Sequence, residues 1–249
     1  MFSAPWDKRF EIDNAGSLLK WRLLARARDF GTKFFSFFGY RTCRTVEYEF
    51  IMKNILYKGR RILDVGSTGS LLPLKLAKQG YNVCSIDSRE YHECHPNLTF
   101  VKGDILRSLF PDDFFDLVVC VSTIEHIGVG AYGDPQYEDG DKLAVKEFGR
   151  ILKEGDTLLL TTPFSGEYRV LPWMSSYERI YDYNRLKSLF EGWKIQLEEY
   201  YVPKKIKHWV KASRKEAEKS YRVYPRSNLI CLMLRNKECP THKTEQRLA

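Results

Sequence analysis

Short apolar runs that end at acidic or glycine residues alternate, along the middle of this chain, with segments whose apolar residues recur every three or four positions. Such runs are typical of parallel strands covered on both faces, and the longer period is typical of helices that pack one face on a core. We expect strands over 61–65, 82–87, 98–101, 115–122 and 157–162, and helices over 46–56, 71–79 and 142–153. This alternation predicts an α/β fold with a doubly wound, mostly parallel sheet.

The pattern changes after Pro163. Asp182 is placed to cap a helix over 183–190, because a carboxylate at this position can accept hydrogen bonds from the amides of the first turn. Two further strands are expected over 193–202 and 228–236, and a basic segment joins them.

The N-terminal part has a different pattern, because residues 15–38 predict a helix with leucines on one side and arginines on the other. Such a helix can pack on the domain as a lid, form a dimer contact or lie on a membrane surface. We therefore divide the chain into a helical extension (1–45), an α/β domain (46–236) with a basic insertion (204–226), and a tail (237–249).

Composition adds bounds on location and partners. The 249 residues fit one α/β domain with additions. The net charge of +8 is concentrated in the N-terminal stretch and in 204–226. Such patches indicate nucleic acid, a phospholipid surface or a diphosphate-bearing substrate as partner, or else a solvated helix face. The first residues lack the apolar stretch of a secretory signal, and no apolar run approaches the ~20 residues that span a bilayer, so we expect a cytoplasmic protein.

The first expected strand runs into a glycine turn, Asp64-Val65-Gly66-Ser67-Thr68-Gly69. A turn of this kind lets a ligand approach the backbone amides and the start of the next helix. Asp64 can bond a positively charged amino group of a cofactor, or the amides of the turn. Taken alone, the two glycines also fit a tight turn that binds nothing.

Acidic residues follow the next two strands as well. Asp87 ends the second strand and is placed to accept hydrogen bonds from ribose hydroxyls. Asp104 follows the third strand, where a carboxylate can accept from the exocyclic amine of adenine while Ile105 packs on the ring. Each acid also fits a plain cap or turn, but their positions on consecutive strand ends favour a nucleoside ligand.

The fourth expected strand ends at Ser122 and is followed by Glu125 and His126. Ligands bind outside the carboxyl ends of the strands in such sheets, so both side chains are expected beside the cofactor. An unperturbed histidine has a pKa near 6.5, which makes His126 a candidate general base. A core histidine is the alternative.

Together these features resemble class I S-adenosylmethionine-dependent methyltransferases over about 46–236. The acid-x-Gly motif matches 64–66, the ribose acid matches Asp87, and the adenine-site pair matches Asp104 and Ile105. The segment 148–163 is similar to a late motif of the family. The resemblance implies a seven-stranded Rossmann-like sheet whose last strand runs antiparallel beside the sixth. A narrower similarity is to bacterial and archaeal methyltransferases associated with glycan or cell-envelope biosynthesis, through the blocks 122–128, 132–135, 140–141 and 179–182.

Two departures from the family pattern bear on the site. Family members commonly carry Gly-x-Gly-x-Gly, whereas Thr68 and Ser70 occupy the second and third glycine positions here, so side chains are expected to crowd the cofactor. Some metal-dependent O-methyltransferases carry Glu-x-x-Glu-His after the fourth strand. Here Ser122 replaces the first glutamate and removes a carboxylate that a divalent ion needs, so we expect no metal.

The resemblance implies methyl transfer from S-adenosylmethionine to an oxygen acceptor, with His126 taking the hydroxyl proton and Glu125 orienting it. It implies cofactor contacts from Asp64, Gly66, Ser67, Thr68, Gly69, Asp87, Ser88, Asp104, Ile105 and Ser122, and acceptor contacts from Tyr132, Asp134 and Asp141. A sugar or lipid-linked glycan is the favoured acceptor, by analogy with the family. The alternatives are RNA 2′-O-methylation, with 204–226 on the phosphates, and a non-catalytic module that keeps the fold.

Overall fold

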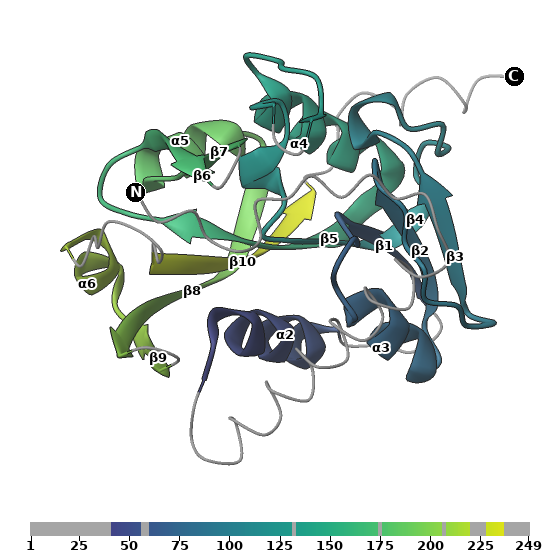
Figure 1. Cartoon of the computed structure of the whole chain (residues 1–249), viewed down its shortest axis with the longest axis horizontal. Helices are drawn as coiled ribbons and strands as arrows, with labels where there is room; N and C mark the ends of the chain where they lie inside the picture. The colour runs from purple at the N-terminus through teal and green to yellow at the C-terminus, as the bar shows by residue number, and fades with distance from the viewer. Residues whose placement is uncertain are drawn as a thin grey trace, which may run out of the picture.

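The computed structural model describes residues 41–55, 60–130, 133–173, 176–205, 208–219 and 228–236. Within these residues an eight-stranded sheet forms the centre of the molecule, in the order β3-β2-β1-β4-β5-β10-β8-β9 (Figure 1). Its strands are β1 (Arg61–Val65), β2 (Asn82–Asp87), β3 (Leu98–Lys102), β4 (Phe115–Val121), β5 (Leu152–Phe164), β8 (Trp193–Lys205), β9 (His208–Ala212) and β10 (Asn228–Asn236). The helices are α2 (Cys43–Asn54), α3 (Leu72–Lys78), α4 (Gly140–Ile151), α5 (Tyr183–Leu189), α6 (Arg214–Lys219) and the 3₁₀ turns η1 (Ile105–Arg107) and η2 (Ile124–His126).

The strand directions confirm the expected mostly parallel sheet. β1 lies parallel to β2 and β4, β2 is parallel to β3, and β4 is parallel to β5. β10 runs antiparallel to both β5 and β8. The strand order runs from β1 in both directions, so the carboxyl ends of β1 and β4 border the crevice in which such sheets bind ligands.

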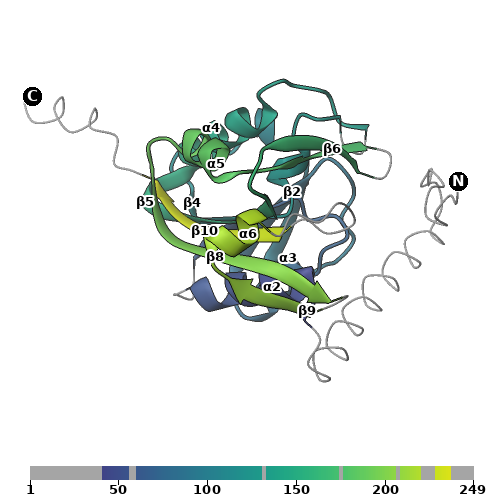
Figure 2. The ribbon, with the colours of Figure 1, turned by 90° about the vertical axis from the view of Figure 1, so that its left-hand side faces the viewer.

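Helices cover both faces of this sheet, with α4 and α5 above it and α2 and α3 below (Figures 1 and 2). Successive side chains of a strand point to opposite faces. Ile62 therefore packs in the core with residues of α2 and α3, while its neighbour Leu63 packs with residues of α4 and α5. Both side chains are fully buried, and each contributes about 1.5–3 kcal/mol by leaving water.

Most expected elements are confirmed, and β1, β2 and β10 have the expected bounds. Asp182 caps α5 as predicted, because its Oδ1 accepts from the amide of Arg185 at 2.7 Å. The helix expected over 142–153 ends at Ile151, because Leu152 already pairs with Phe115 in the sheet. The register between β4 and β5 then shifts, so that Leu117 pairs with Thr157.

Two pairs of elements go beyond the sequence prediction. β6 (Arg169–Trp173) and β7 (Ser176–Ile180) form an antiparallel hairpin after β5. β9 and α6 come from the segment expected as a basic insertion, and β9 adds an eighth strand to the expected seven. Arg41 runs beside β9, where its carbonyl accepts from the amide of Trp209 at 2.9 Å.

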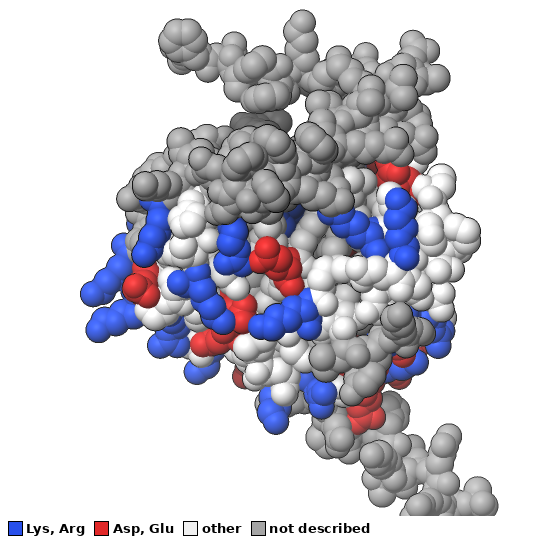
Figure 3. Space-filling model, turned by 90° about the horizontal axis from the view of Figure 1, so that it is seen from below, with Lys and Arg blue, Asp and Glu red and all other residues white. Residues whose placement is uncertain are grey.

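Several sequence expectations lie outside the described residues, namely the amphipathic helix over 15–38, Tyr132, and parts of 204–226. Lys and Arg side chains gather on the side of the molecule where β9 and α6 lie (Figure 3). In the part of the chain that the structure describes, no helix is long and apolar enough to cross a membrane.

Candidate functional site

The glycine turn after β1 is packed directly against the segment after β4. Gly66 has φ +83°, a backbone conformation that side chains disfavour. A Cβ at this position would lie 2.2 Å from Oγ1 of Thr123, so the turn needs glycine for two separate reasons. The amide of Gly66 donates to the carbonyl of Ile86 at 2.9 Å and thereby ties the turn to β2.

The turn also meets the acid at the end of β2. The buried carboxylate of Asp87 accepts from the amide of Thr68 at 2.8 Å and from the amide of Arg89 at 2.9 Å. The structure thus brings together the turn and the residue expected to bind ribose. Because the two strands end side by side, a ligand that contacts one also lies within reach of the other.

The two side chains expected to crowd the turn are held by neighbouring protein groups. The hydroxyl of Thr68 lies 3.4 Å from the carbonyl of Arg89 and 3.3 Å from that of Glu90, to which it donates. The hydroxyl of Ser70 is 2.7 Å from that of Tyr48. Each side chain is therefore fixed by a hydrogen bond in a defined position.

Two buried polar atoms at the turn lack partners in the described part of the chain. Asp64 is 3% exposed and its Oδ2 has no hydrogen-bond partner, and the same holds for the fully buried Oγ of Ser67. Burial, together with the charge of Asp87, raises the pKa of Asp64 to about 7, and Arg44 opposes the shift. Buried polar atoms without partners cost free energy, so this corner fits a ligand that brings a hydrogen-bond donor or a positive charge.

Helix α2 supplies a part of the site that the sequence analysis missed. Its Glu47 is 1% exposed and accepts from the hydroxyls of Ser122 and Thr161, the latter at 2.9 Å. The second oxygen of Glu47 lies 3.3 Å from the guanidinium of Arg44. The feature of the sequence that could have pointed to Glu47 is its place among the apolar, core-facing positions of this helix. Ser122, with φ +45°, is held by this contact and by its amide, which donates to the carbonyl of Thr161 at 3.0 Å.

The expected adenine-site residues lie after β3. Asp104 caps η1 by accepting from the amide of Leu106 at 2.9 Å, and Ile105 is buried. Asp134 belongs to the same neighbourhood. Burial raises its pKa, a hydrogen bond from Ser88 opposes this, and the charges of Asp87 and Asp104 raise it further. The structure therefore places Asp134, expected at the acceptor, beside the candidate cofactor residues.

Glu125 and His126 occupy η2, at the carboxyl end of β4, in unexpected protonation states. Burial lowers the pKa of His126 to about 4, and its Nδ1 lies 3.3 Å from the carbonyl of Tyr177. Glu125 is 1% exposed, and its Oε2 accepts from Thr162 at 3.3 Å. Burial raises the pKa of Glu125 well above its usual value. At neutral pH His126 is thus a neutral but weak base, and burial favours the protonated form of Glu125.

Asp141 has structural contacts in place of the expected acceptor contact. Its carboxylate is completely buried and receives two hydrogen bonds from Arg185, at 2.8 and 3.1 Å, and one from Tyr181 at 3.3 Å. Arg179 adds an ion pair at 3.7 Å. These contacts join the start of α4 to α5 and β7, and we do not retain Asp141 as an acceptor contact.

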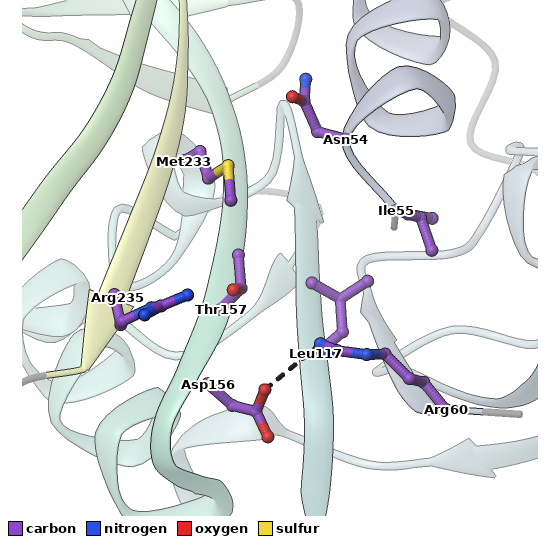
Figure 4. A pocket seen from close by; sticks show the side chains of 8 residues that line it. All are labelled: Asn54, Ile55, Arg60, Leu117, Asp156, Thr157, Met233 and Arg235. Atoms are coloured by element: carbon purple, nitrogen blue, oxygen red, sulfur yellow. Dashed lines mark hydrogen bonds and ion pairs between the residues drawn. The ribbon is translucent and has the colours of Figure 1, made fainter. Parts of the chain in front are cut away.

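The structure has one cavity next to this site and another at the opposite edge of the sheet. The larger, of about 420 Å³, lies between the segment after β4 and the β6–β7 hairpin, and is lined by Gly128, Val129, Gln136, Tyr137, Glu138, Tyr168, Val170, Tyr177 and Arg179. The smaller, of about 120 Å³, lies at the amino ends of the parallel strands, where Arg60 pairs with Asp156 at 3.2 Å (Figure 4). Only the larger cavity adjoins η2. Among the described residues, no three His, Cys, Asp or Glu side chains are grouped to hold a metal ion.

Comparisons with known proteins identify the fold. A family model described as "Caenorhabditis protein of unknown function, DUF268" matches residues 108–230. The solved structure of Burkholderia thailandensis 1,6-didemethyltoxoflavin-N1-methyltransferase, with bound S-adenosylhomocysteine, matches with a TM-score of 0.58 and 12% identity, covering 93% of this chain and 94% of that one. The chain has the fold of class I methyltransferases.

Sequence comparison finds the same group of proteins. This methyltransferase-like chain is 34% identical over 76 residues to a ubiquinone biosynthesis O-methyltransferase of Rickettsia akari, covering 27% of this chain and 30% of that protein. It is 28% identical over 126 residues to the protein of the same name from Coxiella burnetii, covering 47% and 49%. The chain spans about a third to a half of the length of these curated relatives. The similarity to S-adenosylmethionine-dependent methyltransferases thus holds in both sequence and fold.

Proposed function

We propose that this protein binds S-adenosylmethionine and transfers its methyl group to a hydroxyl oxygen. The observation that carries the proposal is a pair of buried atoms, Asp64 Oδ2 and Ser67 Oγ, that have no partners among the described residues. They lie at a glycine turn that also contacts Asp87. S-adenosylmethionine carries an ammonium group and a ribose diol, which offer donors to such acceptors. The O-methyltransferases among the sequence relatives support an oxygen acceptor.

The site residues would bind three parts of the cofactor: its amino-acid end, its ribose and its adenine. Asp64, with the nearby Arg44, would bind the charged amino-acid end, because one carboxylate and one guanidinium match an ammonium and a carboxylate. Asp87 would accept from the ribose hydroxyls. Asp104 and Ile105 would bind adenine, with Asp134 and Ser88 at the edge. The bound cofactor supplies a sulfonium-activated methyl group, and the protein aligns the acceptor with it and excludes water.

His126 has a positioning role in this proposal. Its neutral imidazole can accept a hydrogen bond from the acceptor hydroxyl and turn an oxygen lone pair toward the methyl group. The low pKa of about 4 makes it a poor final holder of a proton. Burial favours the protonated form of Glu125, which makes it poorly suited to stabilising an imidazolium, and the expectation that Glu125 orients His126 stays a prediction.

The first test is calorimetric titration with S-adenosylhomocysteine, with NAD as a negative control. We expect micromolar binding that Asp87→Ala abolishes, because the ribose and the Thr68 amide both need this carboxylate. Asp112→Ala is the matched control, since its side chain is 73% exposed and pairs with Arg150 near the end of α4. A folded protein that does not bind S-adenosylhomocysteine would support the non-catalytic module.

A sugar or lipid-linked glycan is the acceptor that we propose to test first. The cavity beside η2 presents Tyr137, Tyr168 and Tyr177, and aromatic faces with polar rims suit ring compounds that carry hydroxyls. A larger acceptor would extend from His126 into this cavity. Transfer of a radioactive methyl group to methyl glycosides, lipid-linked glycans and catechols would separate carbohydrate from phenol acceptors.

The cationic side of the molecule favours one second candidate, RNA 2′-O-methylation. Lys204, Arg214, Lys215 and Lys219 are exposed around β9 and α6. Phosphate contacts release counterions, so RNA binding there would fall about tenfold or more between 50 and 200 mM salt. RNA binding that is lost in the double variant Lys215→Glu, Lys219→Glu would support RNA as the acceptor. Methylation of glycosides that does not depend on salt would reject it.

A further inference from the structure

The β6–β7 hairpin carries a buried carboxyl group that the proposed function does not use. Glu178 lies in β7 between Tyr177 and Arg179, which both line the large cavity. Side chains alternate along a strand, so Glu178 faces the opposite side of the hairpin. It is 9% exposed, and no described residue forms a hydrogen bond or ion pair with its carboxylate.

The hairpin is fixed over the carboxyl ends of β4 and β5. The amide of Ser165, just after β5, donates to the carbonyl of Tyr181 at 2.9 Å. The carbonyl of Tyr177 lies 3.3 Å from Nδ1 of His126. These contacts on either side of Glu178 hold β7 against η2, at the edge of the sheet where ligands bind.

Glu178 lies within electrostatic range of the acidic side chain of η2. Its charge adds to burial in raising the pKa of Glu125, so the two carboxyl groups lie close to each other inside the protein. Glu125 already accepts a hydrogen bond from Thr162 at 3.3 Å. No described residue donates a hydrogen bond to Glu178, so the donors to its carboxylate must come from water or from a ligand.

We propose that Glu178 accepts the proton that the acceptor hydroxyl loses during methyl transfer. This inference rests on the proposed function. In the step, an oxygen lone pair forms a bond to the methyl carbon and the S–CH₃ bond breaks, leaving its electron pair on sulfur. The hydroxyl proton moves to the Glu178 carboxylate, which becomes a carboxylic acid and later returns the proton to solvent.

The protonation behaviour of the neighbouring groups agrees with this role. Burial raises the pKa of Glu178 to about 7, which suits a group that must be free to take a proton at neutral pH and hold it. The pKa of about 4 leaves His126 too weak for the same task.

The test needs no acceptor. Sinefungin is an S-adenosylmethionine analogue in which a carbon bearing a protonated amine replaces the sulfonium and its methyl group, so its ammonium points toward the acceptor. We would measure its binding and that of S-adenosylhomocysteine at pH 8 by calorimetry. We expect Glu178→Gln to weaken sinefungin binding about tenfold or more and to change S-adenosylhomocysteine binding less than twofold.

Glu167→Gln is the matched control, because its side chain precedes the same hairpin and is 69% exposed. It should change neither affinity, and thermal melting would confirm that both variants are folded. Equal losses for both ligands in Glu178→Gln, or no loss for either, would overturn the role of Glu178. A wild-type protein that binds neither ligand would instead reject the proposed function, and this inference with it.

Discussion

The carboxylate of Asp87 accepts a hydrogen bond from the backbone amide of Thr68 across 2.8 Å, which links the end of β2 to the turn after β1. The contact uses the main chain of Thr68, and the hydroxyl of this residue bonds to the carbonyls of Arg89 and Glu90. The turn therefore keeps its contact with the acid without glycine at position 68. Backbone and side chain have separate roles here, and substitutions can separate them.

We expect Asp87→Asn to weaken S-adenosylhomocysteine binding by about 10–100-fold, because loss of charge-assisted hydrogen bonds costs roughly 1.5–3 kcal/mol. Thr68→Gly should change binding by less than about threefold, since the amide that Asp87 contacts is retained. Calorimetry of the two variants side by side checks both. A larger loss in Thr68→Gly would mean that the hydroxyl holds the turn in place.

Gly66→Ala should unfold or strongly destabilise the protein. The new Cβ would meet Oγ1 of Thr123 at 2.2 Å and would also occupy a position with φ +83°. Gly80→Ala is the matched control, because Gly80 has φ +92° but no atom within 4 Å of its Cβ position. Gly80→Ala carries only the backbone strain of about 1 kcal/mol, whereas overpacking adds about 1–3 kcal/mol in Gly66→Ala. Urea unfolding would measure the difference, and equal losses would exclude the clash as the cause.

Asp141→Ala should lower stability by about 3–5 kcal/mol, because it leaves the buried guanidinium of Arg179 and its neighbour Arg185 without their carboxylate. Cofactor affinity of the fraction that remains folded should be unchanged. Thermal melting and calorimetry would measure the two effects. An unchanged melting temperature would contradict the structural role and restore Asp141 as a candidate acceptor contact.

The sequence predicted the parallel part of the fold well because each feature there is local. Burial on both faces makes β1 and β4 mostly apolar runs, and the turn at Gly66 interrupts the pattern sharply. The hairpin and β9 escaped prediction for the opposite reason. β9 lies at the edge of the sheet. Its pairing with β8, in which Lys211 lies opposite Tyr201, is set by tertiary contacts.

The site was predictable to the extent that it depends on strand ends. Asp64, Asp87 and Asp104 could be placed from their positions at or just after the carboxyl ends of strands, because parallel strands end at one edge. The protonation states of Glu125 and His126 could not, since they depend on burial by other segments. The same holds for Glu47, which contacts Ser122 and Thr161 from α2.

The carboxylate of Asp64 should lower the stability of the fold while it promotes cofactor binding, and the cost in stability should depend on pH. Its pKa in the folded protein is raised to about 7 from an ordinary value of 3.8. Between these values the folded state holds a proton that the unfolded state has lost, so the stability contributed by this group decreases as pH rises from about 4 to about 7 and stays low above that. Asp64→Asn removes the penalty and should stabilise the protein at pH 8 by at most ~4 kcal/mol. The gain at pH 4.5 should be small. The same variant should lose most of its S-adenosylhomocysteine affinity, because an amide cannot neutralise an ammonium. Urea unfolding at the two pH values would measure the gain, and equal gains at both would show that Asp64 keeps an ordinary pKa in the folded protein.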